Sequence, residues 1–319
     1  MRSLLTLSSE FLKSLQIAEW GYTEELNPTS FNVYEKWVAQ KSHGPLNYLA
    51  DHRKDLRKSI SNVYPEALSS LVFLFDYSQT KKSLNELNPK NKIASYALGF
   101  DDQDYHFWIL EKLNIIGDSL SADIPNLEYK ISLDIHPVLE RDLAYRAGLG
   151  WFGKNSMLIN KEIGSYTLIG SLILNQKLEL DLTDKDVDHC GSCTKCIDAC
   201  PTLAIDSKTR TIEASQCIST YTIELFKDSK PPQGYPTKSQ EVFGCDICQE
   251  VCPWNAKPMG KVKATSFDKS SLISFFNRNK EEILKDLEKM SNNSYKAFFK
   301  KTSFERLGKK GLIKNIDKY

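Results

Sequence analysis

The fold is decided by the stretch Cys190-Gly-Ser-Cys193-Thr-Lys-Cys196-Ile-Asp-Ala-Cys200-Pro201. Its spacing, C-x2-C-x2-C-x3-C-P, matches at every step the bacterial ligand run for iron–sulfur clusters. The two-residue intervals let a short loop place three thiolates around successive irons of one cubane cluster. The three-residue interval and the proline then turn the fourth cysteine away from that cluster. The stretch therefore predicts a module built around 4Fe–4S clusters.

A second group of cysteines completes the pattern. It reads Cys245-x2-Cys248-x3-Cys252-Pro253, and Cys217 lies upstream in place of the cysteine that would begin the run. In two-cluster ferredoxins the fourth cysteine of a run ligates the other cluster. With this crossover, the predicted ligands of one cluster are Cys190, Cys193, Cys196 and Cys252. The predicted ligands of the other cluster are Cys200, Cys217, Cys245 and Cys248.

All eight cysteines lie between Cys190 and Cys252, so none is left over. A disulfide framework is not expected, because the cytosol keeps thiols reduced. Structural zinc is the alternative, since C-x2-C pairs also suit tetrahedral Zn²⁺. Zinc sites, however, rarely use three thiols at this spacing with a proline after the fourth, and the pattern favours two clusters. We interpret His189 as a neighbour of the first cluster, because thiolates already complete both sets.

Length and composition restrict the class of protein. The chain has 319 residues, of which 41% are hydrophobic and 11% aromatic, so it can build buried cores in two or three domains. Its longest apolar runs, residues 71–75 and 172–174, are far shorter than the roughly 20 residues that a membrane span requires. The N-terminus lacks the apolar stretch and cleavage site of a signal peptide. We therefore expect a soluble, cytoplasmic protein with no membrane partner.

Residues 1–180 mix helical and strand-like patterns. Apolar spacing predicts helices over residues 9–18, 105–116 and 137–147, and strands over residues 71–75, 129–135, 156–159 and 166–174. The expected core positions of the second helix are Phe107, Trp108, Leu110 and Leu113. The predicted fold class is α+β, with an α/β first domain (1–180), a cluster module (181–256) and a short helical C-terminal region (257–319).

The C-terminal region reverses the charge balance. Residues 257–319 hold 16 Lys or Arg against 7 Asp or Glu, whereas the first 256 residues hold 26 against 34. The net charge of +1 therefore arises because the excess of acidic residues before residue 257 nearly cancels the excess of basic residues after it. In the densest part, cations (Lys296, Lys300, Lys301, Arg306, Lys309, Lys310 and Lys314) are interleaved with aromatic residues (Tyr295, Phe298, Phe299 and Phe304). This pattern suits phosphate contacts and base stacking in a nucleic acid, and equally a solvated helix face over an ordinary aromatic core.

Two nucleotide-binding motifs overlap in the stretch Gly148-Leu-Gly150-Trp-Phe-Gly153-Lys154-Asn155, which matches the dinucleotide motif in full and the P-loop motif almost in full. The dinucleotide motif G-x-G-x-x-G must follow a strand and open a helix, but here a predicted helix precedes it and a predicted strand follows it. In a P-loop, a Ser or Thr hydroxyl binds Mg²⁺ at the position that Asn155 occupies. We reject both motifs. We interpret the stretch instead as a glycine-rich, cationic turn, which is suited to close backbone contact with a large ligand.

Longer motifs give the chain a family resemblance. They are Asp134-Ile-His-Pro-Val-Leu-Glu-Arg141, Arg146-Ala-Gly-Leu-Gly-Trp-Phe-Gly-Lys-Asn-Ser156, Cys217-Ile-Ser-Thr-Tyr-Thr-Ile-Glu224, Phe243-Gly-Cys-Asp-Ile-Cys-Gln-Glu-Val-Cys-Pro-Trp-Asn255 and residues 302–315. With the cysteine pattern, these motifs resemble epoxyqueuosine reductase over nearly the whole chain. The resemblance implies a cobalamin-dependent iron–sulfur enzyme that completes queuosine biosynthesis. In that family the epoxide of epoxyqueuosine, at the wobble position of the tRNA anticodon, is reduced to an alkene.

The resemblance also implies the architecture, the cofactors and the partners. The first domain would be a cobalamin-binding domain like that of reductive dehalogenases. The second would be a ferredoxin-like module with two 4Fe–4S clusters, and the basic C-terminal region would help to hold tRNA that carries epoxyqueuosine. Electrons from a low-potential donor would pass through the clusters to cobalamin. We expect the enzyme to act as a monomer.

The resemblance further implies the site residues. Asp134 matches the family's proposed proton donor and is also a predicted cobalamin contact. The other predicted cobalamin contacts are Arg57, Ala97, Lys154, Asn155, Ser156, Leu158 and Ile169. The sequence departs from the family in two places. His136 stands where many members have glycine, and the sequence stops at Tyr319 without the helical repeats of longer members.

The residues themselves give Asp134 a chemical rationale. It follows a strand-like run, where a side chain can point into a cleft, and the loss of an epoxide oxygen as water needs a proton donor whose pKa burial would raise. An Asp that ends a strand or caps a helix before Pro137 is the structural alternative. Asp134-x-His136 also begins a cobalt-ligating D-x-H-x-x-G box. Because Leu139 replaces its glycine, we do not expect His136 to bind cobalt.

Two other functions are compatible with parts of the sequence. A reductive dehalogenase would use the same cofactors on a small organohalide, with Tyr96, Tyr105 or Tyr166 as proton donor. It would be indifferent to tRNA and would carry an export signal. A two-cluster electron-transfer protein would bind no cobalamin. The residues from 134 to 156 and the basic C-terminal region favour the tRNA-modifying reductase.

Overall fold

The structure, a computed structural model, describes residues 7–100, 102–225, 229–235, 240–264, 266–267 and 270–318. By its contacts the chain divides into two compact units. Unit 1 consists of Met1–His43, Asn47–Asp76 and His106–Cys193, and unit 2 consists of Gly44–Leu46, Tyr77–Tyr105 and Thr194–Tyr319. Among the described residues, no helix is long and apolar enough to cross a membrane.

The borders of the units differ from those of the three predicted segments. Residues 77–105, which the sequence assigns to the first domain, belong to unit 2. The reason is burial, because Leu84, Ile93 and Ala97 share one hydrophobic core with residues of the C-terminal region. The assignment of separate functions to 1–180, 181–256 and 257–319 stays a prediction.

Unit 1 is built on a four-stranded antiparallel sheet in the order β1-β2-β7-β4. The strands are β1 (Glu19–Thr23), β2 (Ser69–Asp76), β4 (Tyr129–Ser132) and β7 (Thr167–Leu174). The central pair is in register from Ser69 opposite Leu174 to Asp76 opposite Thr167. All five residues from 71 to 75 are fully buried, as a short uninterrupted apolar run predicts. The strands predicted at 71–75 and 166–174 are therefore confirmed.

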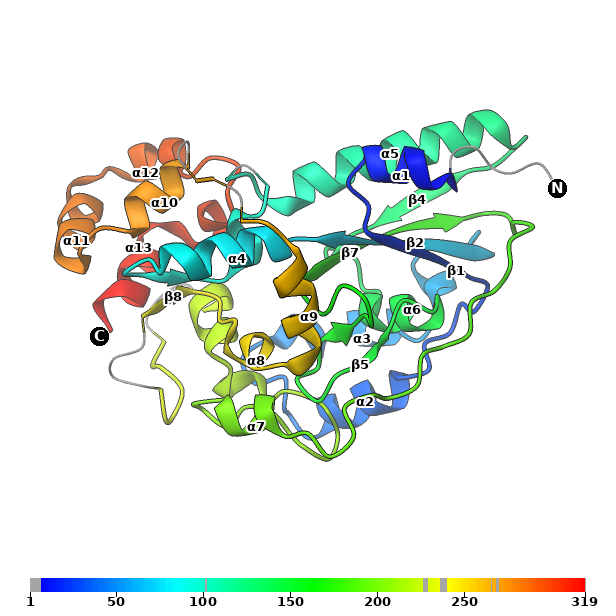
Figure 1. Cartoon of the computed structure of the whole chain (residues 1–319). Helices are drawn as coiled ribbons and strands as arrows, with labels where there is room; N and C mark the ends of the chain where they lie inside the picture. Colours follow the sequence, from blue (N-terminus) through cyan, green and yellow to red (C-terminus); the bar gives the residue numbers. More distant parts are fainter. Residues whose placement is uncertain are drawn as a thin grey trace. The chain divides into compact units, whose positions relative to one another are not determined.

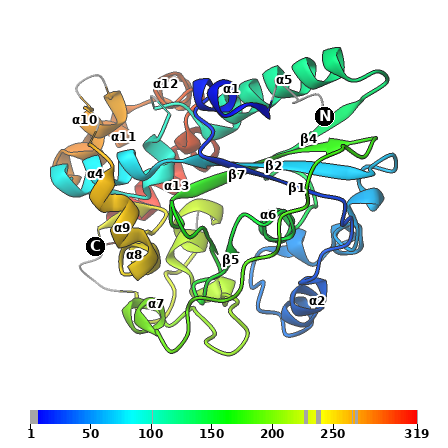
Figure 2. The same ribbon diagram turned by 45° about the vertical axis from the view of Figure 1, so that its right-hand side comes forward.

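Two helices cover the two faces of this sheet (Figures 1 and 2). They are α5 (Tyr105–Asp123) and α6 (Glu140–Arg146). On the α5 face, the ring of Trp108 meets Phe75 edge to face, with 5.6 Å between the ring centroids. On the α6 face, Leu143 and Ala144 share a buried cluster with Val72 of β2. Successive residues of β2 thus point to opposite faces, and both faces are packed.

The helix predicted at 105–116 is confirmed, but two of its expected core positions are wrong. Phe107 is 46% exposed and Leu110 is 42% exposed, whereas Leu113 is fully buried. The buried stripe of α5 is Ile109, Leu113, Ile116 and Leu120. These positions recur at intervals of three and four residues and so share one helix face. The helix carries apolar residues on several sides, and the sheet selects which of them are buried.

Gly170→Ala is expected to destabilise unit 1. An added Cβ would lie 2.9 Å from Cγ2 of Ile109 and 3.0 Å from Cδ1 of Leu113, so side chains of α5 would have to move. Overpacking of this kind costs about 1–3 kcal/mol. Denaturant titration followed by circular dichroism measures the loss. In the control variant Gly260→Ala, nothing lies within 4 Å of the new methyl group. Equal unfolding midpoints for G170A, G260A and the wild type would contradict the prediction.

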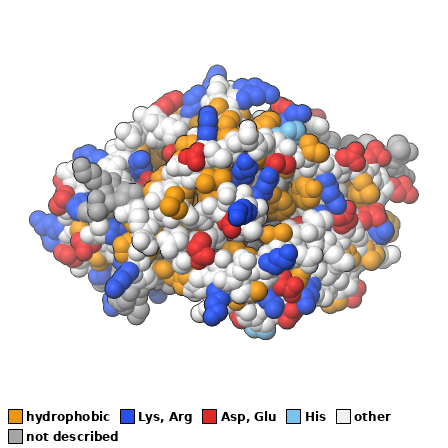
Figure 3. All heavy atoms as spheres, turned by 90° about the horizontal axis from the view of Figure 1, so that it is seen from below, with side chains coloured by type: hydrophobic (Ala, Val, Ile, Leu, Met, Phe, Trp, Pro, Cys, Tyr) orange, Lys and Arg blue, Asp and Glu red, His pale blue; other side chains and the backbone are white. Residues whose placement is uncertain are grey.

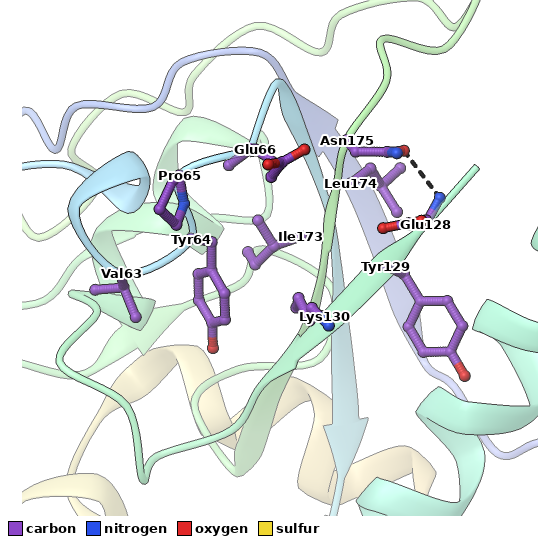
Figure 4. A pocket seen from close by; sticks show the side chains of 11 residues that line it. Val63, Tyr64, Pro65, Glu66, Glu128, Tyr129, Lys130, Ile173, Leu174 and Asn175 are labelled. Carbon is purple, nitrogen blue, oxygen red and sulfur yellow. Dashed lines mark hydrogen bonds between the residues drawn. The ribbon is translucent and has the colours of Figure 1, made fainter. Parts of the chain in front are cut away.

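Shorter elements complete unit 1. They are α1 (Ser9–Ser14), α2 (Phe31–Ala39), α3 (Arg53–Leu56) and a hairpin of β5 (Trp151–Phe152) and β6 (Leu158–Ile159). A pocket at the edge of the sheet is lined by residues 63–67, 128–130 and 173–175. Tyr64 and Tyr129 lie on two sides of it (Figure 4). This pocket contains none of the predicted site residues.

Unit 2 contains a short parallel pair of strands, β3 (Lys92–Ile93) and β8 (Glu241–Phe243). Its helices are α4 (Ser78–Leu87), α7 (Lys195–Ala199), α8 (Ile247–Glu250), α9 (Pro253–Lys261), α10 (Ser271–Phe276), α11 (Lys280–Lys289), α12 (Asn292–Phe298) and α13 (Ser303–Asp317). The last four gather in one group (Figure 1). The predicted helical C-terminal region is confirmed.

Most of the aromatic residues among the C-terminal cations form the core of unit 2. Tyr295, Phe299 and Phe304 are at most 1% exposed, and the rings of Tyr295 and Phe299 lie 4.5 Å apart. Phe298, at 39% exposed, is accessible. The prediction that these aromatic residues stack on bases is therefore wrong for the three buried rings. Their spacing places them on the inner faces of α12 and α13, so the alternative of an ordinary aromatic core is confirmed for them.

Candidate functional site

The loop between β4 and α6 presents Asp134. Its φ of 49° is a left-handed conformation that residues other than glycine rarely adopt. The backbone N–H of Asp134 donates to Oε1 of Glu140 over 2.7 Å. The hydroxyl of Ser132 donates to the same oxygen over 3.0 Å. Glu140, the first residue of α6, thus holds the backbone of Asp134 in this turn.

The carboxyl group of Asp134 is accessible. Its side chain is 66% exposed, and Oδ2 lies 3.9 Å from Nε2 of His106 on α5. Asp134 does not cap a helix, because the N-cap residue of α6 is Leu139. The alternative that Asp134 caps a helix is therefore wrong. The burial expected of a proton donor is also not found, because the side chain of Asp134 is exposed.

The surroundings of Asp134 shift the pKa values of two nearby groups, Glu140 and His136. Burial raises the pKa of Glu140 to about 8, and the charge of Asp134 adds to the shift. The hydrogen bonds from Asp134 and Ser132 and the charge of Arg141 act in the opposite direction. Burial also lowers the pKa of His136. Nδ1 of His136 is buried without a hydrogen-bond partner among the described residues, which is typical of a site that a further group completes.

The glycine-rich turn is tied to this loop through α6. Arg141 donates from Nη1 to the carbonyl oxygen of Ser156 and, over 3.0 Å, to its hydroxyl oxygen. Asn155 is buried, and its Oδ1 accepts the N–H of Met157. Helix α6 precedes the turn and strand β6 follows it, so the rejection of the dinucleotide motif is confirmed.

Lys154 connects the turn to the first cysteine loop. Its ammonium group donates to the carbonyl oxygens of Gly191 and Cys193, over 2.7 and 2.9 Å. All of these residues belong to unit 1. Lys154 therefore brings the predicted cofactor-contacting turn next to two predicted cluster ligands, Cys190 and Cys193. His189 stacks edge to face on Trp151, with 4.8 Å between the ring centroids.

The other predicted cobalamin contacts are distributed over both units. Arg57 is 9% exposed and lines a small pocket with Pro137 and Val138, which follow Asp134 in the loop. Leu158 is buried, and Ile169 packs partly buried against the same cluster in unit 1. Ala97 lies in unit 2, where its side chain is buried in the core. Unit 1 thus brings together all the predicted contacts except Ala97.

Four predicted ligands of one cluster lie near one another in unit 2. Burial raises the pKa of Cys248, and the charges of Cys217 and Cys200 add to the shift. Burial likewise raises the pKa of Cys245, with contributions from Cys248 and Cys217. Cys196 is also close enough to act on Cys248. Thiols whose pKa is raised in this way ionise readily only when a metal takes the place of the proton.

The spacing of the cysteines suits clusters better than single metal ions. In the described part of the chain, no three His, Cys, Asp or Glu side chains are grouped as one ion would require. A tetrahedral Zn²⁺ would hold its thiolates at about 2.3 Å from one centre. A cubane offers a separate iron to each thiolate, so its ligands stand farther apart.

Asp246 anchors the loop between two predicted ligands, Cys245 and Cys248. Its Oδ2 accepts the N–H and the hydroxyl of Ser95, over 3.0 and 2.7 Å, and an ammonium hydrogen of Lys81 over 3.2 Å. The side chains of Lys81 and Asp246 are 6% and 5% exposed. No sequence pattern indicates this anchor, because Ser95 and Lys81 are far from Asp246 in the chain.

Glu140 and His106 are two further residues of the site that the sequence did not predict. Glu140 lies in the segment from Asp134 to Arg141, one of the motifs that carry the family resemblance. Its place in that motif was the only sequence feature that could have indicated a role in the site. No local pattern marks His106, because α5 and the Asp134 loop come together only when the sheet of unit 1 forms. The site in unit 1 therefore combines a carboxyl pair, a histidine and a cationic turn.

The C-terminal cations have different surroundings. Lys309 and Lys314 donate to the carbonyl oxygens of Met290 and Tyr221, and burial lowers the pKa of Lys314 to about 8. Lys296, Lys300 and Lys310 are exposed. On the face seen in Figure 3, Lys and Arg side chains are interspersed with Asp and Glu. The exposed lysines, rather than the whole basic segment, are available to an anionic partner.

Known proteins match the chain over most of its length. A family model described as "Epoxyqueuosine reductase QueG, DUF1730" matches residues 57–134, and one for a 4Fe-4S double cluster binding domain matches residues 189–255. The epoxyqueuosine reductase of Cyclobacterium marinum is 37% identical over 94% of this chain and 90% of its own length. The chain belongs to the epoxyqueuosine reductase family. It is an oxidoreductase of queuosine biosynthesis in tRNA, and it carries a 4Fe–4S double-cluster domain.

Further relatives and solved structures agree with this assignment. The epoxyqueuosine reductase of Leadbetterella byssophila is 36% identical over 88% of this chain and 86% of its own length. A structure of the Bacillus subtilis enzyme, with its catalytic loop swung out of the active site, is 28% identical with a TM-score of 0.71. Another epoxyqueuosine reductase, solved with an epoxyqueuosine-modified tRNA stem loop, is 27% identical with a TM-score of 0.70. Each match covers 96% of this chain and 78% of the other.

The comparisons confirm the predicted α+β fold and the predicted iron–sulfur module of this reductase. All eight cysteines lie within the residues that match the double-cluster model. The division of the cysteines into two ligand sets and the contacts to cobalamin stay predictions.

Proposed function

We propose that this reductase converts the epoxide of epoxyqueuosine to the alkene of queuosine at the wobble position of tRNA, with electrons passing through two 4Fe–4S clusters to cobalamin. A low-potential donor supplies the electrons. The observation that carries the proposal is the placement of Asp134 in the loop after β4, with its carboxyl group 66% exposed. An accessible carboxylic acid beside a cofactor can donate a proton to an oxygen that leaves.

The residues of unit 1 fit cobalamin as a large, partly polar group. When bound, cobalamin supplies a reducing cobalt centre next to the substrate. Arg57, Asp134, Lys154, Asn155, Ser156, Leu158 and Ile169 would hold it in a domain like that of reductive dehalogenases, with Ala97 as a further contact. The unpartnered Nδ1 of His136 and the raised pKa of Glu140 support a bound group at this loop.

Eight thiols in two sets fit two 4Fe–4S clusters. The proximity of Cys200, Cys217, Cys245 and Cys248 supports the second set. The bond from Lys154 to the backbone of Cys193 supports a short path between the clusters and the cofactor. The chain's own part in catalysis is to hold these groups, to exclude water and to supply protons from Asp134.

We further propose that the enzyme acts as a monomer in the cytoplasm, where its tRNA substrate and reduced clusters coexist. The relative that was solved with an epoxyqueuosine-modified tRNA stem loop supports tRNA as the partner. The exposed Lys296, Lys300 and Lys310 support a contact between the C-terminal region and phosphates.

Replacing Lys296, Lys300 and Lys310 by glutamine is expected to weaken tRNA binding about 10-fold at low salt, because each phosphate contact releases counterions. The slope of binding against salt concentration should also become less steep. Filter binding over a salt series measures both effects. The matched control replaces the exposed Lys13, Lys36 and Lys130 of unit 1. The same affinity and salt slope in both triple variants would contradict a role for the C-terminal lysines.

An anaerobic turnover assay tests the proposed function. The protein is loaded with iron–sulfur clusters and cobalamin, reduced with a low-potential reductant and incubated with tRNA that carries epoxyqueuosine. We expect queuosine in the digested tRNA, detected by mass spectrometry. Fully loaded protein that forms no queuosine would refute the proposal. Turnover of a small organohalide without effect on tRNA would indicate the dehalogenase, and intact clusters without cobalamin binding would indicate an electron carrier.

A further inference from the structure

Helix α13 packs against β8 (Figure 1) and joins the two chain segments that carry Cys217 and Cys245. Asn315 of this helix is fully buried, and its Nδ2 donates to the carbonyl oxygens of Thr222 and Val242, over 2.7 and 2.9 Å. Thr222 lies five residues after Cys217, and Val242 lies three residues before Cys245. One amide group of the C-terminal helix therefore bonds both segments.

The hydroxyl group of Thr222 holds the same two segments together. It donates to the carbonyl oxygen of Ile218 over 2.8 Å, and its oxygen accepts the N–H of Gly244 over 3.0 Å. Ile218 and Gly244 are the direct neighbours of Cys217 and Cys245 in the chain. Buried hydrogen bonds thus fix the backbones of two predicted ligands relative to each other, and α13 takes part in this arrangement.

Two lysines of α13 direct their ammonium groups at the same segments. Nζ of Lys314 donates to the carbonyl oxygens of Tyr221, over 2.8 Å, and of Leu225. Nζ of Lys318 donates to the carbonyl oxygen of Glu241 over 2.7 Å. The centroid of the Tyr221 ring lies 4.0 Å from Nζ of Lys314 and 5.4 Å from Nζ of Lys318. Both positive charges are therefore held at defined places.

These places adjoin the predicted ligands. The backbone N–H of Tyr221, whose carbonyl oxygen binds Lys314, donates to the carbonyl oxygen of Cys217 over 3.1 Å. Glu241 precedes Cys245 by four residues, which even a fully extended strand keeps within about 13 Å. The charge of Cys245 also acts on Lys318. Each lysine is thus bonded to the backbone close to a different ligand.

Two cations in this arrangement are unfavourable unless anions balance them. Lys314 and Lys318 are four residues apart on one helix face, where like charges destabilise a helix. Burial lowers the pKa of Lys314 to about 8 and that of Lys318 to about 7, and the charge of Lys314 adds to the second shift. Glu241 supplies one nearby carboxylate, whereas Glu224 pairs with Arg306. A cluster with its four thiolates would supply further negative charge here.

We propose that α13 is part of the site of the second cluster, where Lys314 and Lys318 raise the reduction potential of the cluster that Cys217 and Cys245 help to bind. The inference rests on the ligand set in the proposed function. Reduction adds one electron from the low-potential donor, and no bond forms or breaks. A nearby positive charge stabilises the added electron, more strongly in a partly buried site than in water. The donor therefore reduces this cluster more easily.

Lys81, a further lysine of unit 2, is less suited to this role. Its Nζ lies 3.2 Å from Oδ2 of Asp246, and it also pairs with Glu250. Two carboxylates thus face one ammonium group, and the group as a whole carries no excess positive charge. At the two lysines of α13 the ratio is reversed.

A redox titration followed by electron paramagnetic resonance tests the proposal. The protein with both clusters is titrated electrochemically without oxygen at about pH 6, which keeps both ammonium groups protonated, and the wild type should show two midpoint potentials. Lys314→Met combined with Lys318→Met should make one cluster about tenfold harder to reduce, a fall of about 59 mV for one electron. The other midpoint potential should not change.

Three controls separate charge from packing. Lys314→Arg combined with Lys318→Arg keeps both charges and should keep the wild-type midpoint potentials. Glu241→Gln removes a negative charge that acts on Cys245, so it should shift the same midpoint potential upward. Lys309→Met changes a lysine of α13 that donates elsewhere, to the carbonyl oxygen of Met290, and should shift neither potential.

Two results would overturn this inference and leave the proposed function intact. One is a double methionine variant that holds both clusters at the wild-type potentials. The other is an equal fall in the double arginine variant, which would assign the effect to packing. The single variant Lys318→Met gives the same comparison, with a smaller shift, where the double variant does not assemble both clusters. Wild-type protein that assembles no second cluster would instead refute the proposed function.

Discussion

Asp134→Asn is expected to lower the rate of queuosine formation by about 10²–10⁴-fold, the usual contribution of a general acid. Asparagine has nearly the size of aspartate but no acidic proton. It also tolerates the left-handed conformation that Asp134 adopts, with φ of 49°, so the turn should be preserved. The expected loss therefore reports on chemistry rather than on folding. Single-turnover rates under anaerobic conditions measure it.

The control for this variant is the cofactor content. Iron should be retained in D134N at the wild-type level, because no predicted cluster ligand is changed. Cobalamin should be retained as well, because asparagine keeps the size and one side-chain oxygen of Asp134, and the other predicted contacts are unchanged. Visible absorbance and iron analysis measure both. A D134N protein with full cofactor content and undiminished turnover would exclude Asp134 as the proton donor. It would shift the search to Glu140 and His106, which adjoin it.

Asp142→Ala is expected to destabilise unit 1 by about 3–5 kcal/mol, the usual cost of breaking a buried ion pair. The side chains of Asp142 and Arg146 are each 1% exposed, and Oδ1 accepts from Nε of Arg146 over 2.6 Å. Asp142 also accepts the N–H and hydroxyl of Thr29 and the N–H of Ser30. Alanine would leave a buried guanidinium and two backbone donors without these acceptors.

Denaturant titration of the holoprotein measures this loss. The double variant Asp142→Ala with Arg146→Met should recover part of the stability, since it removes the unpaired charge as well. Glu24→Gln, at the more exposed pair of Glu24 and Lys177, should change the midpoint far less. If D142A were no less stable than E24Q, the buried pair would not hold α6 against the rest of unit 1.

The cysteine spacing predicted the iron–sulfur module because its information is local. Thiolates that bind one cubane must lie on a short loop, so their intervals are visible in the chain. The strands at 71–75 and 166–174 were predictable for a similar reason, since short uninterrupted apolar runs suit buried strands. The sequence also predicted that a helix precedes the turn around Gly150 and that a strand follows it. This order is the reverse of the one that the dinucleotide motif requires, and it excluded that motif.

Predictions failed where one segment had more than one apolar face. Phe107 and Leu110 are exposed although their helix was identified, because the sheet buries only the stripe over Gly170. In the sequence, Tyr295 and Phe299 were compatible both with stacking on bases and with packing in a core. In the structure, α12 and α13 pack so that both rings are buried in the core.

By itself, the sequence determined the family, the cluster chemistry and the residue on which the proposed reaction depends, since each is carried by residues close together in the chain. The tertiary structure alone decided what surrounds that residue. It placed Glu140 and His106 next to Asp134 and tied Lys154 to the loop of Cys193. It also divided the C-terminal cations into bonded and exposed ones. The physical reason is that hydration, pKa and proton transfer depend on neighbours in space, which arise only when the elements pack together.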